Sequence, residues 1–336
     1  MISHNARLIL FNHLKGGAKA VSRADDISKL YDALTGTLRV DQPQVDEPVS
    51  PGLQSLLDQL NQGAAPHLYP LELGEGPLCD VYSEAAAPKV VVVVSAKGGV
   101  GRTTLTAALA SSLQRQGHPA LALDLDPQDG LRHHLAPGVN MAGVGATSLL
   151  NKTWEALPVR GFAGCRVVAF GETDPVQQQS LNRWLGQDLE FLAKRLDGMK
   201  LSGRDTLIID VPAGNTVYLS QAMSVADVVL VVVQADVASF RSLTQMDRVL
   251  APYLDHAKSP YRFYVINQVD PAHRFSQDMV DVFKLRLGEA VLGTLQRDPA
   301  FIEAQAYGRD PLDPVSNSAA CRDLSSLCRE LLKRIN

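Results

Sequence analysis

Short apolar segments recur along the chain from residue 89 onward, and longer segments of mixed polarity separate them. The apolar segments are residues 90–94, 120–123, 166–170, 206–209, 228–233, 262–266 and 291–295. They are rich in valine, isoleucine and leucine without polar alternation, which is typical of parallel strands buried on both faces. The segments between them are long enough for helices. The pattern therefore predicts an α/β fold with a doubly wound, mostly parallel sheet.

Residues 1–88 differ from this pattern and predict a small helical N-terminal extension of a domain that covers 89–336. The clearest element in the extension is an amphipathic helix over 25–34, which begins with acidic residues and is followed by Gly36, a residue typical of helix ends. The apolar face of this helix consists of Ile27, Leu30, Tyr31 and Leu34.

A second short helix is expected over 51–60, and residues 41–51, rich in proline and acids, predict a linker before it. The whole extension holds six Lys and Arg residues against eleven Asp and Glu residues, a net charge of −5. Two short helices bury little apolar surface alone, so we expect them to dock on the main domain or on a partner. A helical appendage that only completes its own domain is the open alternative.

Composition narrows the possible functions. The chain has 336 residues with 32 Lys and Arg against 36 Asp and Glu, so no overall positive field draws it to nucleic acid or to an anionic membrane. Its four cysteines are scattered without a zinc spacing, which together with an N-terminus unlike a secretory signal predicts a cytoplasmic protein. No segment approaches the roughly 18 apolar residues of a membrane span, so no transmembrane segment is expected.

The strongest candidate site follows the first apolar segment, where the sequence reads Lys97-Gly98-Gly99-Val100-Gly101-Arg102-Thr103-Thr104. Glycines let backbone N–H groups turn inward around phosphate oxygens, and the start of the helix expected over 105–113 favours an anion. We predict that all eight residues bind a nucleotide and that the Thr103 hydroxyl is a ligand of Mg²⁺. Arg102 stands where a Walker A loop normally carries lysine. A tight turn without a ligand is the alternative.

Carboxylates follow two further apolar segments. Asp124 and Asp126 come after 120–123. Residues two apart on a strand point to the same side, so both side chains should face one crevice. There one can support a metal ion and the other can position water. Asp210 follows 206–209, the Walker B arrangement that holds Mg²⁺ through water. Because the carboxyl ends of parallel strands share one edge of a sheet, we expect these acids beside the glycine-rich loop. Strand-end acids that only cap the next helix are the alternative.

Two residues after later segments are candidates for the base of the nucleotide. Asn267 is placed to read a purine edge, and Arg297 could close the base pocket. The alternatives are that Asn267 binds the backbone of a loop and that Arg297 is only a solvent-exposed residue at the rim of the pocket. His133 and His134 are expected at the surface. The apolar stripe of residues 324–335 predicts a last helix packed on its own sheet, with membrane binding as the alternative.

The three motifs together resemble the deviant Walker A ATPases related to MinD and ParA, over residues 89–336. The motifs are Lys97-Gly98-Gly99-Val100-Gly101, Asp124-Leu125-Asp126-Pro127-Gln128 and Asp210-Val211-Pro212-Ala213-Gly214. The resemblance implies a P-loop NTPase that binds ATP and Mg²⁺ and forms a homodimer across ATP. It also implies that Lys97 reaches the partner's phosphates, that Asp126 positions the hydrolytic water, that Asp124 supports the Mg²⁺ shell and that Asp210 is the Walker B acid.

Within this family the chain most resembles the ATPase-like proteins of bacterial cellulose secretion systems. This implies as partners the cellulose synthase complex and its accessory proteins at the inner membrane, with peripheral attachment through them, and no specific nucleic acid. Residues 26–31 are similar to short segments of accessory proteins such as BcsR and BcsP. The guanidinium of Arg102 is longer and bulkier than the ammonium group of a lysine, and phosphoryl transfer depends on precise positioning. We therefore predict ATP binding with slow or negligible hydrolysis.

Three rival functions share the nucleotide site. A ParA-type segregation ATPase would act on DNA and would favour a basic surface, which the acidic extension does not supply. A MinD-type positioning ATPase would act on a membrane through its last helix. A metabolic enzyme of the same fold would need residues for substrate chemistry, and no Cys/His or Ser/His arrangement of that kind stands out in the sequence.

Overall fold

An eight-stranded sheet organises the protein, seen in a computed structural model that describes residues 27, 30–32, 34–35, 87–254, 259–313 and 318–335. Its strand order is β3-β4-β2-β5-β1-β6-β7-β8. The strands are β1 (Lys89–Val94), β2 (Ala120–Asp124), β3 (Val159–Arg160), β4 (Arg166–Val168), β5 (Thr206–Asp210), β6 (Val228–Gln234), β7 (Tyr261–Val269) and β8 (Val291–Gln296). Every described pairing is parallel except that of β3 with β4 at the sheet edge. The predicted mostly parallel sheet is confirmed, and β3 is an addition to it.

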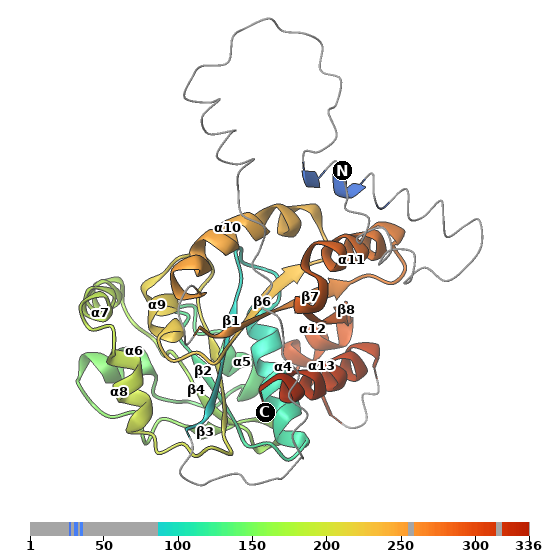
Figure 1. The fold of residues 1–336 in the computed structure, drawn as a ribbon. Coiled ribbons are helices and arrows are strands. Elements are labelled where there is room, and N and C mark those ends of the chain that lie inside the picture. Colours follow the sequence, from blue (N-terminus) through green and yellow to red (C-terminus); the bar gives the residue numbers. More distant parts are fainter. Residues whose placement is uncertain are drawn as a thin grey trace, which may run out of the picture.

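Helices cover both faces of this sheet (Figure 1). They are α4 (Arg102–Arg115), α5 (Leu131–Leu135), α6 (Val144–Leu149), α7 (Pro175–Gln187), α8 (Phe191–Asp197), α9 (Val217–Met223), α10 (Val237–Leu254), α11 (Arg274–Leu287), α12 (Pro299–Ala306) and α13 (Ala319–Ile335). Two short 3₁₀ turns, η1 (Phe162–Gly164) and η2 (Gly288–Ala290), lie between these elements.

Successive residues of the central strands supply two separate cores. Val90 and Val92 of β1 pack with α6 to α11, whereas Val91 and Val93 pack with α4, α5 and α13 on the opposite face. Because side chains alternate across a strand, a sheet that is covered on both sides needs apolar residues at every position. The five valines of residues 90–94 are each 5% exposed or less, which explains why the strand shows no polar alternation.

The last helix packs on its own sheet, as predicted. Its apolar stripe contributes five residues to the core that α4 also lines, namely Leu324, Leu327, Cys328, Leu331 and Ile335. Gly293 of β8 lies against this helix so closely that an added Cβ would stand 2.9 Å from Leu327 Cδ1. No helix among the described residues combines the length and apolar character needed to cross a membrane.

The N-terminal amphipathic helix docks on the main domain through its predicted apolar face. Ile27 is 1% exposed, and Leu30, Tyr31 and Leu34 pack against the core shared by α10 and α11. The Tyr31 ring meets Phe240 of α10 edge-on at 6.2 Å between ring centroids. The predicted linker 41–51 and second helix 51–60 lie outside the described residues.

Candidate functional site

The glycine-rich loop joins β1 to α4 at the carboxyl edge of the sheet. Gly99 and Gly101 have φ values of 78° and 86°, a left-handed conformation that L side chains rarely adopt. A Cβ on Gly101 would stand 2.4 Å from Asn267 Nδ2, so a side chain is excluded there on both grounds. The loop thus brings its backbone to the start of α4, a helix of 14 residues whose N-terminus favours an anion.

Arg102, the first residue of α4, turns its guanidinium into a buried acidic cluster. Nε donates to Asp210 Oδ1 at 2.8 Å, Nη2 to Asp126 Oδ2 at 2.5 Å, and Nη1 to Ser95 Oγ at 3.1 Å. The Arg102 side chain is 9% exposed, and those of Asp126 and Asp210 are 11% and 0% exposed. One cation therefore contacts directly two acids that were predicted separately, and its third partner, the Ser95 hydroxyl, was not predicted.

The other predicted metal ligands take different places around this cluster. Thr103 Oγ1 donates to Asp210 Oδ2 at 2.5 Å. Burial raises the pKa of Asp210, although Arg102 and Thr103 partly offset that rise. Asp124 lies beside Asp210 in the register of β2 and β5, but its two oxygens accept backbone N–H groups from Asp126 and Leu131, both at 2.9 Å. Burial, and then the charge of Asp210, raises the pKa of Asp124 well above its ordinary value.

Lys97 lies on the opposite side of the loop and pairs with Asp236, directly before α10. Its Nζ stands 3.1 Å from Asp236 Oδ2, and the two side chains are 33% and 40% exposed. Burial opposes ionisation of Asp236, but hydrogen bonds from Ser239 and Lys97 outweigh it and lower the pKa of Asp236. Asp236 stands two residues after the end of β6, so the strand-end rule that identified the other acids could also have found it.

Side-chain amides at the ends of β6 and β7 hold the loop from outside. Asn267 Nδ2 donates to Val100 O at 2.8 Å, and Gln234 Nε2 donates to Gly99 O at 3.3 Å and to Gln268 Oε1 at 2.9 Å. In this conformation Asn267 binds loop backbone, so its contact with a base stays a prediction. Arg297 is exposed, and its backbone N–H donates to Val269 O at 2.8 Å. Gln234 and Gln268 were not predicted.

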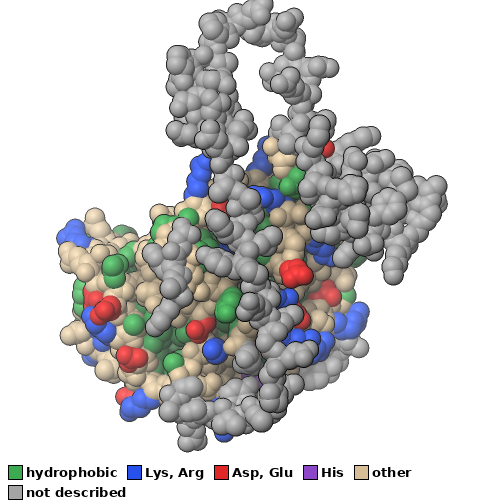
Figure 2. All heavy atoms as spheres, viewed as in Figure 1, with side chains coloured by type: hydrophobic (Ala, Val, Ile, Leu, Met, Phe, Trp, Pro, Cys, Tyr) green, Lys and Arg blue, Asp and Glu red, His purple; other side chains and the backbone are tan. Residues whose placement is uncertain are grey.

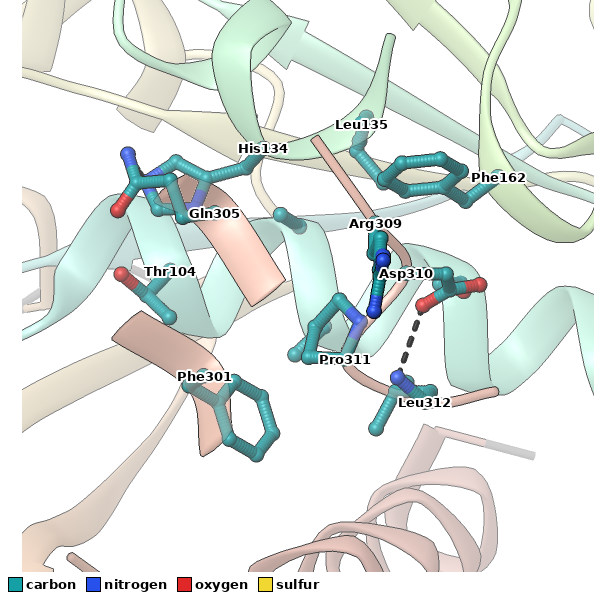
Figure 3. Close-up of a pocket in the computed structure, with 13 residues that line it drawn as sticks. Thr104, His134, Leu135, Phe162, Phe301, Gln305, Arg309, Asp310, Pro311 and Leu312 are labelled. Atoms are coloured by element: carbon teal, nitrogen blue, oxygen red, sulfur yellow. Dashed lines mark hydrogen bonds between the residues drawn. The ribbon is translucent and has the colours of Figure 1, made fainter. Parts of the chain in front are cut away.

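Thr104 faces a narrow hollow between α4, α5 and α12 (Figure 3). The hollow also receives His134 and Phe301, and it ends at Asp310, whose Oδ1 accepts Leu312 N–H at 2.9 Å. Burial, and then the neighbouring His133, lowers the pKa of His134 to about 4, so its imidazole is neutral at physiological pH. His133 is exposed, as expected, whereas His134 is only partly exposed because α12 covers part of it.

The residues beside the loop suit Mg²⁺ only in part. Thr103 and Asp210 offer a hydroxyl and a carboxylate, the oxygen ligands that this ion prefers. Among the residues that the structure describes, no group of three or more His, Cys, Asp or Glu side chains could hold a metal by itself. The two side chains therefore fit a metal ion that brings further ligands with it, such as the oxygens of a nucleotide.

Comparison with known proteins places the chain in a family. The family model for cellulose biosynthesis protein BcsQ matches residues 89–332. The cellulose biosynthesis protein BcsQ of Salmonella typhi is 26% identical over 234 residues, which are 69% of this chain and 89% of that protein.

Solved structures support the same fold. A plasmid partition protein of Borrelia burgdorferi bound to AMPPNP matches with a TM-score of 0.61 and 17% identity, over 74% of this chain and 100% of that one. The septum site-determining protein MinD of Pyrococcus horikoshii, complexed with Mg-ADP, matches with a TM-score of 0.60 and 20% identity, over 74% and 97%. The fold is that of the MinD and ParA P-loop NTPases, and by its family-model match the chain belongs to the BcsQ family of cellulose biosynthesis proteins.

Proposed function

We propose that this protein binds ATP, dimerises across it, and regulates or assembles a bacterial cellulose synthesis and secretion complex, with slow or negligible hydrolysis. The observation that carries the proposal is the buried contact of Arg102 with both Asp126 and Asp210. The chain has a phosphate-binding loop, but Asp126, the acid expected to position water, is already bound by Arg102. A conformational role for the nucleotide follows more readily from this geometry than rapid turnover does.

Nucleotide binding is supported by the loop itself. Its left-handed glycines and the amide clamp from Asn267, Gln234 and Gln268 hold the backbone in one shape before any ligand arrives. Preorganisation of this kind lowers the cost of binding. The AMPPNP and Mg-ADP complexes of the structural neighbours support ATP and Mg²⁺ as ligands for this chain. Thr103 and Asp210 would hold Mg²⁺, which neutralises phosphate charge when bound.

Slow hydrolysis is supported by the contacts of Asp126. One carboxylate oxygen accepts from Arg102 at 2.5 Å and the other from Gln128 N–H at 3.0 Å. To orient water as a base, Asp126 would have to release a buried guanidinium, and breaking a buried ion pair costs about 3–5 kcal/mol. A cost of that size in the transition state slows a reaction by at least about 100-fold. We expect turnover below about 1 per second, the low end of ordinary enzyme rates.

Dimerisation across ATP is supported by the accessibility of Lys97. Its ion pair with Asp236 is one-third exposed, and exposed pairs contribute only about 0–1 kcal/mol. Lys97 can therefore leave Asp236 for the phosphates of a second subunit at small cost. The dimer would place its two loops face to face.

A role in cellulose synthesis is favoured over the DNA and membrane alternatives. Acidic and basic side chains are interspersed on the face shown in Figure 2, which gives no support to a DNA-binding stripe. The apolar stripe of α13 is buried in the core, so its residues are committed to packing instead of a lipid surface. The BcsQ family membership then makes the cellulose synthase complex the best candidate partner.

Size-exclusion chromatography with light scattering tests the dimer. The wild-type protein should become dimeric with ATP, and Lys97→Ala should stay monomeric while it still binds ATP. Lys200→Ala is the matched control, because Lys200 also forms an exposed ion pair, with Glu155 at 2.7 Å, away from the loop. Unchanged dimers of Lys97→Ala would refute the cross-subunit role of the lysine.

Co-purification tests the cellular role. Tagged protein from its native host should carry the inner-membrane cellulose synthase, and deletion of the chain should reduce cellulose secretion. Recovery of DNA or of bare lipid, with no synthase, would contradict the proposal in favour of the two rival functions.

A further inference from the structure

The docked N-terminal helix stands at one end of a continuous series of contacts that leads to Lys97. The Tyr31 ring packs edge-on against Phe240 of α10, and Asp236, one helical turn before Phe240, pairs with Lys97. We propose that the N-terminal helix restrains ATP-dependent dimerisation, because its packing on Phe240 fixes the start of α10 and so keeps Lys97 on Asp236. This restraint rests on the proposed function, in which Lys97 must leave Asp236 to reach a second subunit.

Phe240 is the residue of α10 that the N-terminal helix contacts through an aromatic ring. Its side chain is 6% exposed and meets two rings edge-on, Tyr31 at 6.2 Å and Phe283 of α11 at 5.4 Å between ring centroids. Edge-on contact is a preferred arrangement of aromatic pairs. Ile27 belongs to the same core and is 1% exposed. Because such a core is close-packed, loss of the Tyr31 ring would leave space into which Phe240 can move.

The first turn of α10 connects Phe240 to Asp236 through hydrogen bonds. Phe240 N–H donates to Asp236 O at 3.1 Å, and Ser239 N–H donates to Asp236 Oδ1 at 2.6 Å. Ser239 is 1% exposed, and its hydroxyl accepts Gln234 N–H at 3.1 Å. The turn that carries the Phe240 ring therefore also orients the Asp236 carboxylate, and a shift of this turn would move both.

The pair between Lys97 and Asp236 is weak enough to respond to such a shift. Lys97 Nζ lies 3.3 Å from Asp236 Oδ1 and 3.1 Å from Oδ2, and the two side chains are 33% and 40% exposed. Exposed pairs contribute little because two side chains must lose conformational freedom to form them. A carboxylate that is already held in place loses less of that freedom, so the docked helix strengthens the hold on Lys97.

The rate at which an amine-reactive reagent labels Lys97 in the full chain, measured by mass spectrometry without nucleotide, tests the coupling itself. We expect Tyr31→Ala and Ile27→Asp to raise this rate about two- to fivefold, the range that an exposed pair can supply. Trp184→Ala is the matched control, because Trp184 of α7 is also half-buried and packs edge-on against Phe191, at 5.2 Å between ring centroids. It should leave the rate unchanged. An unchanged rate in Tyr31→Ala would overturn the restraint.

Light scattering at increasing ATP concentrations tests the effect on dimerisation. Tyr31→Ala should form half of its dimers at an ATP concentration about two- to fivefold below that of the wild type. Asp236→Asn keeps an oxygen for Ser239 N–H but loses the charge, so it should lower that concentration too. Because the helix acts through Asp236, adding Tyr31→Ala to Asp236→Asn should change nothing further.

Two results would overturn the restraint in this assay. One is a Tyr31→Ala protein that needs as much ATP as the wild type or more, and the other is an additive effect of the two substitutions. A wild-type protein that stays monomeric with ATP would instead refute the proposed function. The labelling rates of Lys97 would then still decide whether the N-terminal helix controls this residue.

Discussion

Replacing Arg102 by leucine should destabilise the protein strongly, because two acids would then share a buried site without a cation. The side chains of Asp126 and Asp210 are 11% and 0% exposed, so water cannot replace the lost contacts. Removing one partner of a buried ion pair costs about 3–5 kcal/mol. That is a large part of the roughly 5–15 kcal/mol by which a folded domain is stable. Urea denaturation followed by circular dichroism should show a midpoint lower by about 1 M or more.

The stability lost in Arg102→Leu should also depend on pH, and the structure determines the direction of this dependence. Arg102 holds down the pKa of Asp210, which burial raises. Without the arginine the folded-state pKa of this acid rises further above its unfolded value, so the folded state binds the proton more tightly. The penalty is then present above the folded pKa and fades as the pH falls through it. Arg102→Leu should therefore lose less stability under mildly acidic conditions than at neutral pH.

A matched variant separates this effect from the loss of any arginine on α4. The side chain of Arg115 is 32% exposed and pairs with Asp310 at 2.6 Å, and Arg115→Leu should cost only about 0–1 kcal/mol. A second variant, Arg102→Leu with Asp210→Asn, should recover part of the loss because it removes one uncompensated charge. A loss below about 1 kcal/mol for Arg102→Leu would refute the reasoning, since the pair would then be no stronger than an exposed one.

Three further predictions concern regions outside the loop. Ile27→Asp should release the N-terminal helix, because the Ile27 side chain is 1% exposed and a charge is costly to bury there. Hydrogen exchange should then show lost protection at residues 30–35, while the protection of β1 stays unchanged. The half-buried His134 has a pKa of about 4, so between pH 6.5 and 4 it should remove up to about 1.4 kcal/mol of stability per pH unit as the pH falls. His134→Gln should reduce that slope in urea melts. Burial raises the pKa of Cys165 to about 12 and that of Cys328 to about 11. Their thiols should therefore react with a disulfide reagent no faster than the chain unfolds. Rapid labelling of the native protein would contradict this prediction.

Burial made most of the fold predictable from sequence. A strand covered on both faces must be apolar at every position, and that requirement produces the uninterrupted runs that mark β1, β5 and β6. The N-terminal helix was predictable for a related reason, because its one apolar face requires a surface to cover it. The strand β3 has only two residues, of which Arg160 is exposed, and its pairing depends on β4. No local pattern marks a strand of that kind.

The sequence predicts which residues form the site but not which contacts they make. The carboxyl ends of the strands identify Asp124, Asp126 and Asp210 from sequence, and the same rule covers the overlooked Asp236. The direction of Arg102 depends on acids 24 and 108 residues away, which meet only when β2 and β5 pair. Sequence places this arginine beside phosphates by its position in the loop. The folded chain turns it to the acids, because uncompensated buried carboxylates cost more than a phosphate contact at an exposed loop can return.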